Sequence, residues 1–247
     1  MSTKWTLVKT VLGIVVLIFL VSFSAKRHGC KPVTDVKIKV DHESGKFFVN
    51  DSLVRKVLEG KQFKVSEVAL GNMEVDQVES LLDRNSFIKK SEVFQDVNGE
   101  LNVKIYQETP IARINTGVDE FYLSEDLNKM PLSTLHSAEV LIVGGRIEEE
   151  DFEGLKDLTE YISADKLLKK HIIAVKKEKP NSFILLVNKG DYIIEFGELK
   201  NFDSKFEKLK LFYDQFLGKV GLNYYERINL RYNNQIVATK RINDDKQ

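Results

Sequence analysis

The sequence has 247 residues, of which 43% are hydrophobic and 30% charged, enough for one large domain or, as we expect, two small domains beside a short anchor. Its 37 basic and 37 acidic residues cancel, which argues against binding to nucleic acid or to an acidic membrane surface. The single cysteine, Cys30, excludes an intramolecular disulfide and a cysteine-rich metal site. The folded part must therefore be held together by its hydrophobic core.

An uncharged apolar run at residues 10–25 predicts a transmembrane helix that follows a short tail, residues 1–9. At 1.5 Å per residue the run covers about 24 Å, which is less than the roughly 30 Å hydrocarbon core of a bilayer. A start at Trp5 lengthens the span if Lys9 extends to the interface, with Lys26 and Arg27 closing the far end. We therefore expect a single uncleaved anchor.

Two alternatives to an uncleaved anchor are disfavoured by the same charges. A cleaved signal peptide needs small residues at its cleavage site, where Lys26 and Arg27 stand. A lipoprotein signal ending at Cys30 is interrupted by Lys26, Arg27 and His28. Because basic residues flank the run on both sides, charge alone does not set its orientation.

Residues 33–108 predict a small unit of order β-α-α-β-β. Alternation of apolar and charged residues predicts a first strand at 36–40. A short helix follows, which Asn50 or Asp51 can cap and Gly60 stops. A second helix is expected at 74–84, and strands at 88–95 and 101–106 flank the turn Val97–Glu100. Asn-Gly within that turn is a strong hairpin signal because both residues tolerate positive φ.

Pro110 marks the boundary to a larger β-rich domain, residues 109–241, because proline ends ladder pairing inside a sheet. Helical spacing predicts helices at 151–162 and 203–217, the second with Phe206, Tyr213 and Phe216 on one face. A polar tail, residues 242–247, follows, and the fold class is α+β. The expected strands lie at 121–123, 138–143, 172–176, 183–187, 192–196, 227–232 and 235–240.

The sequence predicts no catalytic, cofactor or metal site. Four histidines, His28, His42, His136 and His171, stand far apart and outside any metal-binding motif. The acidic run 148–151 is interpreted as a helix start, where carboxylates favour the positive end of the helix dipole. We therefore expect a protein that is not an enzyme. Alanine at His42, His136, His171 or residues 148–151 is expected to leave function essentially intact, given normal folding.

Four segments together resemble the FtsQ/DivIB family, whose first folded unit is a POTRA domain. The longest is VDQVESLLDRNSFIKKSEVFQDVNGELNVKIYQETPIARI at 75–114, with a helix, an N-G turn and a P-I-A-R-I exit. The others are FYLSEDLNKMPLS at 121–133, AEVLIVGG at 138–145 and INLRYNNQIVATK at 228–240. The resemblance covers about residues 33–240.

This resemblance implies a non-catalytic, single-pass scaffold of the bacterial division machinery. Its N-terminus is expected in the cytoplasm, its anchor in the inner membrane at the septum, and its folded domains in the periplasm, where they bind FtsB-like and FtsL-like proteins. The family's FtsB-binding surface includes the last strands, which nominates Arg231, Tyr232, Asn234, Gln235 and Lys240. Asn233-Asn234-Gln235 departs from the small residue or glycine of many members.

We expect the partner to add a strand to the final edge of the sheet. In a strand running to Tyr232, Arg231 would point away from Leu230 and Tyr232 and pair with a partner carboxylate. The alternative function, a POTRA-bearing chaperone-like component of outer-membrane protein assembly, normally comes with repeated POTRA units or a membrane barrel. Only one such unit is evident, which favours division.

Overall fold

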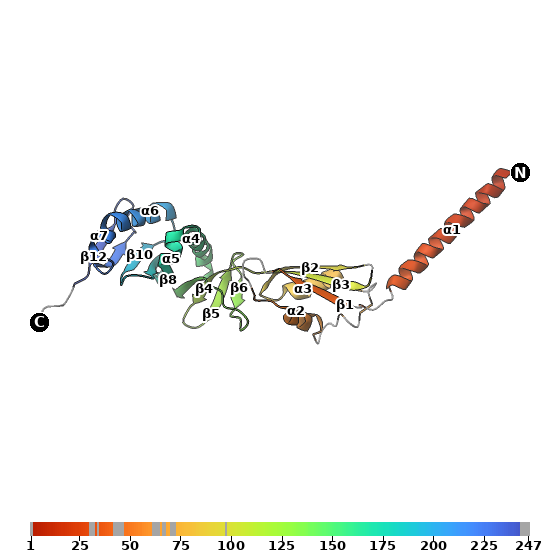
Figure 1. Ribbon diagram of the computed structural model, residues 1–247, viewed down its shortest axis with the longest axis horizontal. Coiled ribbons are helices and arrows are strands. Elements are labelled where there is room, and N and C mark those ends of the chain that lie inside the picture. The colour runs from red at the N-terminus through yellow and green to blue at the C-terminus, as the bar shows by residue number, and fades with distance from the viewer. Residues whose placement is uncertain are drawn as a thin grey trace. The chain divides into compact units, whose positions relative to one another are not determined.

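The computed structural model describes residues 2–29, 33, 35–41, 47–60, 65, 68–69, 73–96 and 98–242; in residues 2–8 and 24–29 the only described side chain is that of Trp5. His42 and Cys30 lie outside these residues. The chain divides into two compact units, Met1–Gln107 and Glu108–Gln247, which we describe separately (Figure 1).

Helix α1, Ser2–Gly29, contains the apolar run expected to be the anchor. Its described large apolar side chains are exposed, from 49% at Val16 to 67% at Trp5. Lys9 Nζ lies 5.9 Å from the centroid of the Trp5 ring. Over the residues that the structure describes, no helix is both long enough and apolar enough to cross a membrane. The transmembrane assignment stays a prediction.

The rest of the first unit has the predicted order β-α-α-β-β. Its three-stranded sheet has the order β1-β3-β2, with β1 parallel and β2 antiparallel to β3. Helices α2 and α3 lie beside the sheet (Figure 1), and their buried residues belong to the same hydrophobic core as those of the strands. The Asn50 side chain caps α2 by accepting a hydrogen bond from the Leu53 N–H at 2.9 Å. The elements are β1 Asp35–Val40, α2 Asp51–Leu58, α3 Val75–Asp83, β2 Ile88–Gln95 and β3 Glu100–Gln107.

The second unit is a mixed nine-stranded sheet of order β12-β11-β10-β9-β8-β7-β4-β5-β6. Residues of α4, α5 and α6 join those of the sheet in one hydrophobic core (Figure 1). The strands are β4 Pro110–Asn115, β5 Glu120–Ser124, β6 Lys129–Pro131, β7 Leu141–Gly145, β8 Ile172–Lys179, β9 Ser182–Val187, β10 Ile193–Gly197, β11 Tyr225–Asn229 and β12 Val237–Lys240. The helices are α4 Phe152–Ala164, α5 Lys166–His171, α6 Phe202–Phe212, a π-helical turn Tyr213–Leu217 and α7 Gly218–Val220.

Sequence patterns missed four elements of this unit: β4, β6, α5 and α7. Pro110 does not end strand pairing as predicted; it is the first residue of β4 and pairs with Ser124, a position where proline is tolerated. Strand β7 begins at Leu141 rather than Ala138.

The predicted helix 203–217 is not one regular α-helix. A π-helical turn at Tyr213–Leu217 inserts a residue into its last part and rotates the following side chains. Phe206 is fully buried, but Phe216 is 51% exposed. The prediction that Phe206 and Phe216 share a core-facing stripe is therefore wrong.

His171, at the end of α5, joins two tyrosines at the boundary of the second core. Its Nε2 lies 2.8 Å from the Tyr192 hydroxyl and 3.0 Å from the Tyr213 hydroxyl. Burial lowers the pKa of His171 below the ordinary 6.5 and raises the pKa of both tyrosines. All three groups are therefore neutral at pH 7.

The pKa of His171 predicts a loss of stability in acid. Below about pH 6.5 the unfolded chain binds a proton at this position that the folded chain resists, so the free energy of unfolding falls as the pH drops toward the lowered folded pKa. Urea unfolding of the wild type at pH 7.5 and 5.5 should show this loss. A His171→Gln variant should lose less between the two pH values; an equal loss would contradict the assignment.

Candidate functional site

Strand β12 is one end of the nine-stranded sheet. Among the described strands it pairs with β11 alone, with Val237 opposite Asn229 and Thr239 opposite Arg227. Ile236 and Ala238 pack against the core, whereas the Val237 side chain is 44% exposed. Such an edge presents unpaired backbone groups to solvent.

Backbone bonds on the other side of β11 determine which amides of β12 face outward. Leu230 donates its N–H to the Glu195 carbonyl on β10, so by alternation Asn229 and Arg227 turn their backbone groups toward β12. Their partners Val237 and Thr239 therefore face inward. Arg241 donates to the Tyr224 carbonyl, which fits the same alternation. The outward N–H groups of β12 are those of Ala238 and Lys240.

Arg231 is not in a strand, because β11 ends at Asn229 rather than at Tyr232. The Asn229 side chain accepts the Arg231 N–H at 3.0 Å, a local bond that competes with ladder pairing. Arg231 Nη2 lies 2.7 Å from Glu195 Oε2. The prediction that a strand presents Arg231 is therefore wrong, and its guanidinium pairs within the chain, while its role in binding a partner stays a prediction.

Glu195 on β10 is the centre of a small charged network. It pairs with Arg227 at 2.5 Å as well as with Arg231, and it accepts a hydrogen bond from the Asn229 amide. Gly197, with φ of 76°, leaves room for Arg231, because a Cβ there would lie 2.7 Å from Arg231 Cγ. The ion pair of Arg231 with Glu195 thus fixes the segment that follows β11 to strand β10.

The loop between β11 and β12 carries the other predicted residues except Lys240. Lys208 Nζ on α6 donates to the carbonyls of Tyr232 at 2.6 Å and Asn233 at 3.0 Å. The Tyr232 side chain is 49% exposed, and Asn234 and Gln235 are also exposed. Lys240 lies at the far end of the four-residue β12, roughly 10 Å from its first residue, Val237. The five residues therefore follow the edge rather than form one cluster.

The family model described as FtsQ/DivIB, C-terminal related, matches residues 109–239, which is more than half of the chain. The chain belongs to the FtsQ/DivIB family. A model of the POTRA-like domain matches residues 31–106, so the first unit of this FtsQ/DivIB protein is POTRA-like. Membership places the chain among bacterial cell-division proteins, as its resemblance implied.

One solved structure that matches is the major extracytoplasmic domain of the trans isomer of the bacterial cell division protein DivIB from Geobacillus stearothermophilus. It is 14% identical, with a TM-score of 0.31, and the match covers 47% of this chain and 98% of that chain. A TM-score this low does not show that the two folds are alike. No curated protein sequence matches the chain.

Sequence reasoning missed part of the exposed apolar surface near the Lys240 end of β12. Here the rings of four aromatic residues lie in a chain. The distance between ring centroids is 5.6 Å for Phe216 and Phe212, 5.3 Å for Phe212 and Tyr225, and 4.9 Å for Tyr225 and Tyr224. In this FtsQ/DivIB protein Phe216 and Tyr224 are 51% and 39% exposed. The π-helical turn that exposes Phe216 has no clear sequence signal.

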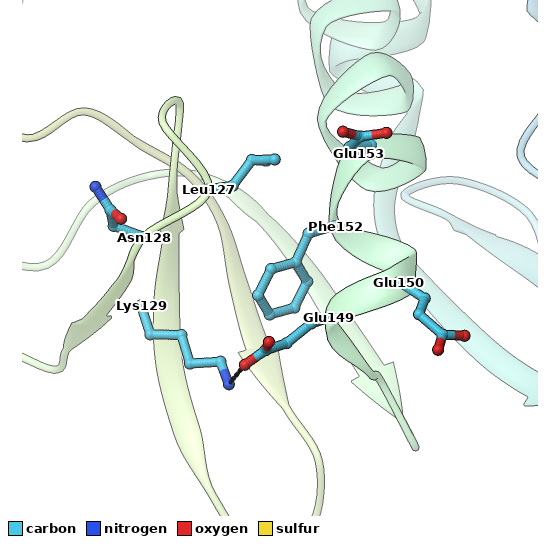
Figure 2. Close-up of a pocket in the computed structure, with 7 residues that line it drawn as sticks. All are labelled: Leu127, Asn128, Lys129, Glu149, Glu150, Phe152 and Glu153. Atoms are coloured by element: carbon cyan, nitrogen blue, oxygen red, sulfur yellow. Dashed lines mark hydrogen bonds and ion pairs between the residues drawn. The ribbon is translucent and has the colours of Figure 1, made fainter.

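A pocket of about 600 Å³ lies where β6 meets the start of α4 (Figure 2). Lys129 Nζ is 2.6 Å from Glu149, and Figure 2 shows the Glu150 carboxylate pointing away from this pair. Glu148 and Asp151 form the capping box of a 3₁₀ turn, Glu149–Asp151, that leads into α4, which confirms that the acidic run starts a helical segment. Among the described residues, no group of three His, Cys, Asp or Glu side chains is placed to hold a metal ion.

Proposed function

We propose that this FtsQ/DivIB protein is a non-catalytic scaffold of the division machinery that holds FtsB-like and FtsL-like proteins by accepting an extended partner segment at β12. The observation that carries the proposal is the open edge of β12, with outward amides at Ala238 and Lys240. Backbone pairing supplies affinity in this mode of recognition, and neighbouring side chains supply specificity.

The surroundings of β12 suit such a segment. Tyr232 is half-exposed at one end of the strand, and the aromatic cluster Phe212, Phe216, Tyr224 and Tyr225 lies near the other. Exposed aromatic rings are common anchors of protein interfaces. The opposite end of the sheet is less suitable, because β6 has three residues and ends in Pro131, which lacks an N–H.

The proposal places α1 in the bacterial inner membrane, with the N-terminus in the cytoplasm and the two units in the periplasm at the septum. The uncharged run 10–25 and the exposed apolar side chains of α1 support this placement. The orientation comes from the family.

Affinity capture of the full-length protein from membranes tests the function. FtsB-like and FtsL-like proteins should be recovered with the wild type and reduced with Tyr232→Ala, since loss of an anchor aromatic costs about 2 kcal/mol. A Val118→Ala variant, altered at a residue that is 91% exposed on the β4–β5 turn, is the control and should retain both. Recovery of outer-membrane proteins instead would support the alternative role in outer-membrane assembly and contradict the proposal.

A further inference from the structure

The outer edge of β2 in the POTRA-like unit is already occupied by side chains. Ser91 and Val93 stand opposite Ile105 and Val103 of β3, and their N–H groups bond to helix α3 instead of to β3. The Ser91 N–H donates to Asp83 Oδ1 at 2.7 Å, and the Val93 N–H donates to Glu79 Oε1 at 2.7 Å. The two backbone N–H groups that would bond to a neighbouring strand are therefore already bonded to carboxylates of α3.

The spacing of the two carboxylates matches the spacing of the two amides. Residues four apart on a helix rise about 6 Å, and residues two apart on a strand are separated by about 6.6 Å. Glu79 and Asp83 therefore stand beside Val93 and Ser91 as the carbonyls of an antiparallel strand would. The Ser91 hydroxyl also donates to Asp83 Oδ1, at 2.7 Å, and the Ser91 side chain is 2% exposed.

A strand that adds to β2 must displace these bonds. Hydrogen bonds to carboxylates are stronger than those to neutral carbonyls, so the exchange would replace two strong acceptors with two weaker ones. Inward-pointing charges of this kind protect sheet edges from unwanted pairing.

We propose that Glu79 and Asp83 close the β2 edge to strand addition, so that a partner strand is directed to β12; the second half of this statement rests on the proposed function. The strand that they keep from pairing with β2 is the β2 strand of a second copy of the chain. Antiparallel self-pairing centred on Ser91 sets Lys90 of each copy opposite Glu92 of the other, which is a favourable arrangement of charge. Without the two carboxylates the edge is therefore self-complementary.

Single-amide hydrogen exchange on the full-length protein tests the closure itself. In the wild type the amides of Ser91 and Val93 should exchange slowly. Glu79→Ala should accelerate exchange at Val93, and Asp83→Ala at Ser91, each by about tenfold or more, because each variant removes one charge-assisted bond. Asp76→Ala, which removes an exposed carboxylate from the same helix, should change neither. Unchanged exchange in the folded Glu79→Ala and Asp83→Ala variants would overturn the proposal.

Self-association tests the consequence. The Glu79→Ala, Asp83→Ala double variant should sediment increasingly as a dimer as its concentration rises, and the amides of Ser91 and Val93 should regain protection in the dimer. The matched Glu79→Gln, Asp83→Asn variant loses the same charge but keeps both acceptors, and it should stay monomeric like the wild type. A folded alanine double variant that stays monomeric, or dimerisation of the amide variant to the same extent, would overturn the proposal. Neither measurement uses a β12 partner, so failure here is distinct from failure of the proposed function.

Discussion

Ala238→Pro is expected to weaken binding of an FtsB-like segment by about tenfold or more while leaving the chain folded. The Ala238 N–H faces away from β11, so proline removes a bond to the partner and none to the sheet, and the pyrrolidine ring obstructs the incoming strand. Isothermal titration calorimetry of the full-length protein with the periplasmic segment of its FtsB-like partner measures the change.

Val237→Pro is the matched control, because the Val237 N–H faces β11. Proline there should lower the melting temperature by detaching β12. Because the bonds alternate along β11, proline at Val237 tests the fold, whereas proline at Ala238 tests the binding edge. Wild-type affinity in a folded Ala238→Pro variant would exclude docking on this edge.

Asp151→Ala is expected to lower the free energy of unfolding by about 3 kcal/mol, because it leaves a buried ammonium without its partner. Lys177 Nζ lies 2.6 Å from Asp151 Oδ2, and the two side chains are only 10% and 8% exposed. Asp151 Oδ2 also accepts the Glu148 N–H at 2.9 Å. Chemical denaturation measures the loss.

Glu150→Ala, at an exposed position in the same turn, is the control and should change the free energy of unfolding by less than about 0.5 kcal/mol. Equal stabilities of the two variants would contradict the buried ion pair. The structure therefore separates residues that the sequence treated alike: alanine is expected to be harmless at Glu150 but costly at Asp151, and at His171 it removes the bonds to Tyr192 and Tyr213.

Local signals predicted the POTRA-like unit well. Three signals depend on only a few neighbouring residues: the alternation of residues 36–40, the Asn50 cap and the Asn98-Gly99 turn. Each can therefore be recognised in a single sequence. In the second unit the parallel pairing of β4 with β7 and of β10 with β11 depends on long-range contacts. Such contacts leave no local pattern, so the order of the strands is not evident from the sequence. Strand β4 itself was missed because Pro110 was interpreted as ending strand pairing, whereas a strand can begin at a proline.

The candidate edge was predicted in place but not in detail. Family resemblance nominated five residues between Arg231 and Lys240, and the edge strand β12 spans Val237–Lys240. The end of β11 depends on a side-chain bond from Asn229, and the pairing of Arg231 depends on Glu195, which is 36 residues away. The bond between Glu79 and Val93 likewise joins a helix to a strand 14 residues away. Hydrophobic periodicity does not encode such contacts.

Amide hydrogen exchange of β12, with and without the FtsB-like segment, measures most directly whether a partner strand adds to this edge. Binding is predicted to protect the outward amides of Ala238 and Lys240, while those of Val237 and Thr239, already bonded to β11, change little. Protection confined to other strands, or none at Ala238 and Lys240 at saturating partner, would contradict docking by strand addition at β12.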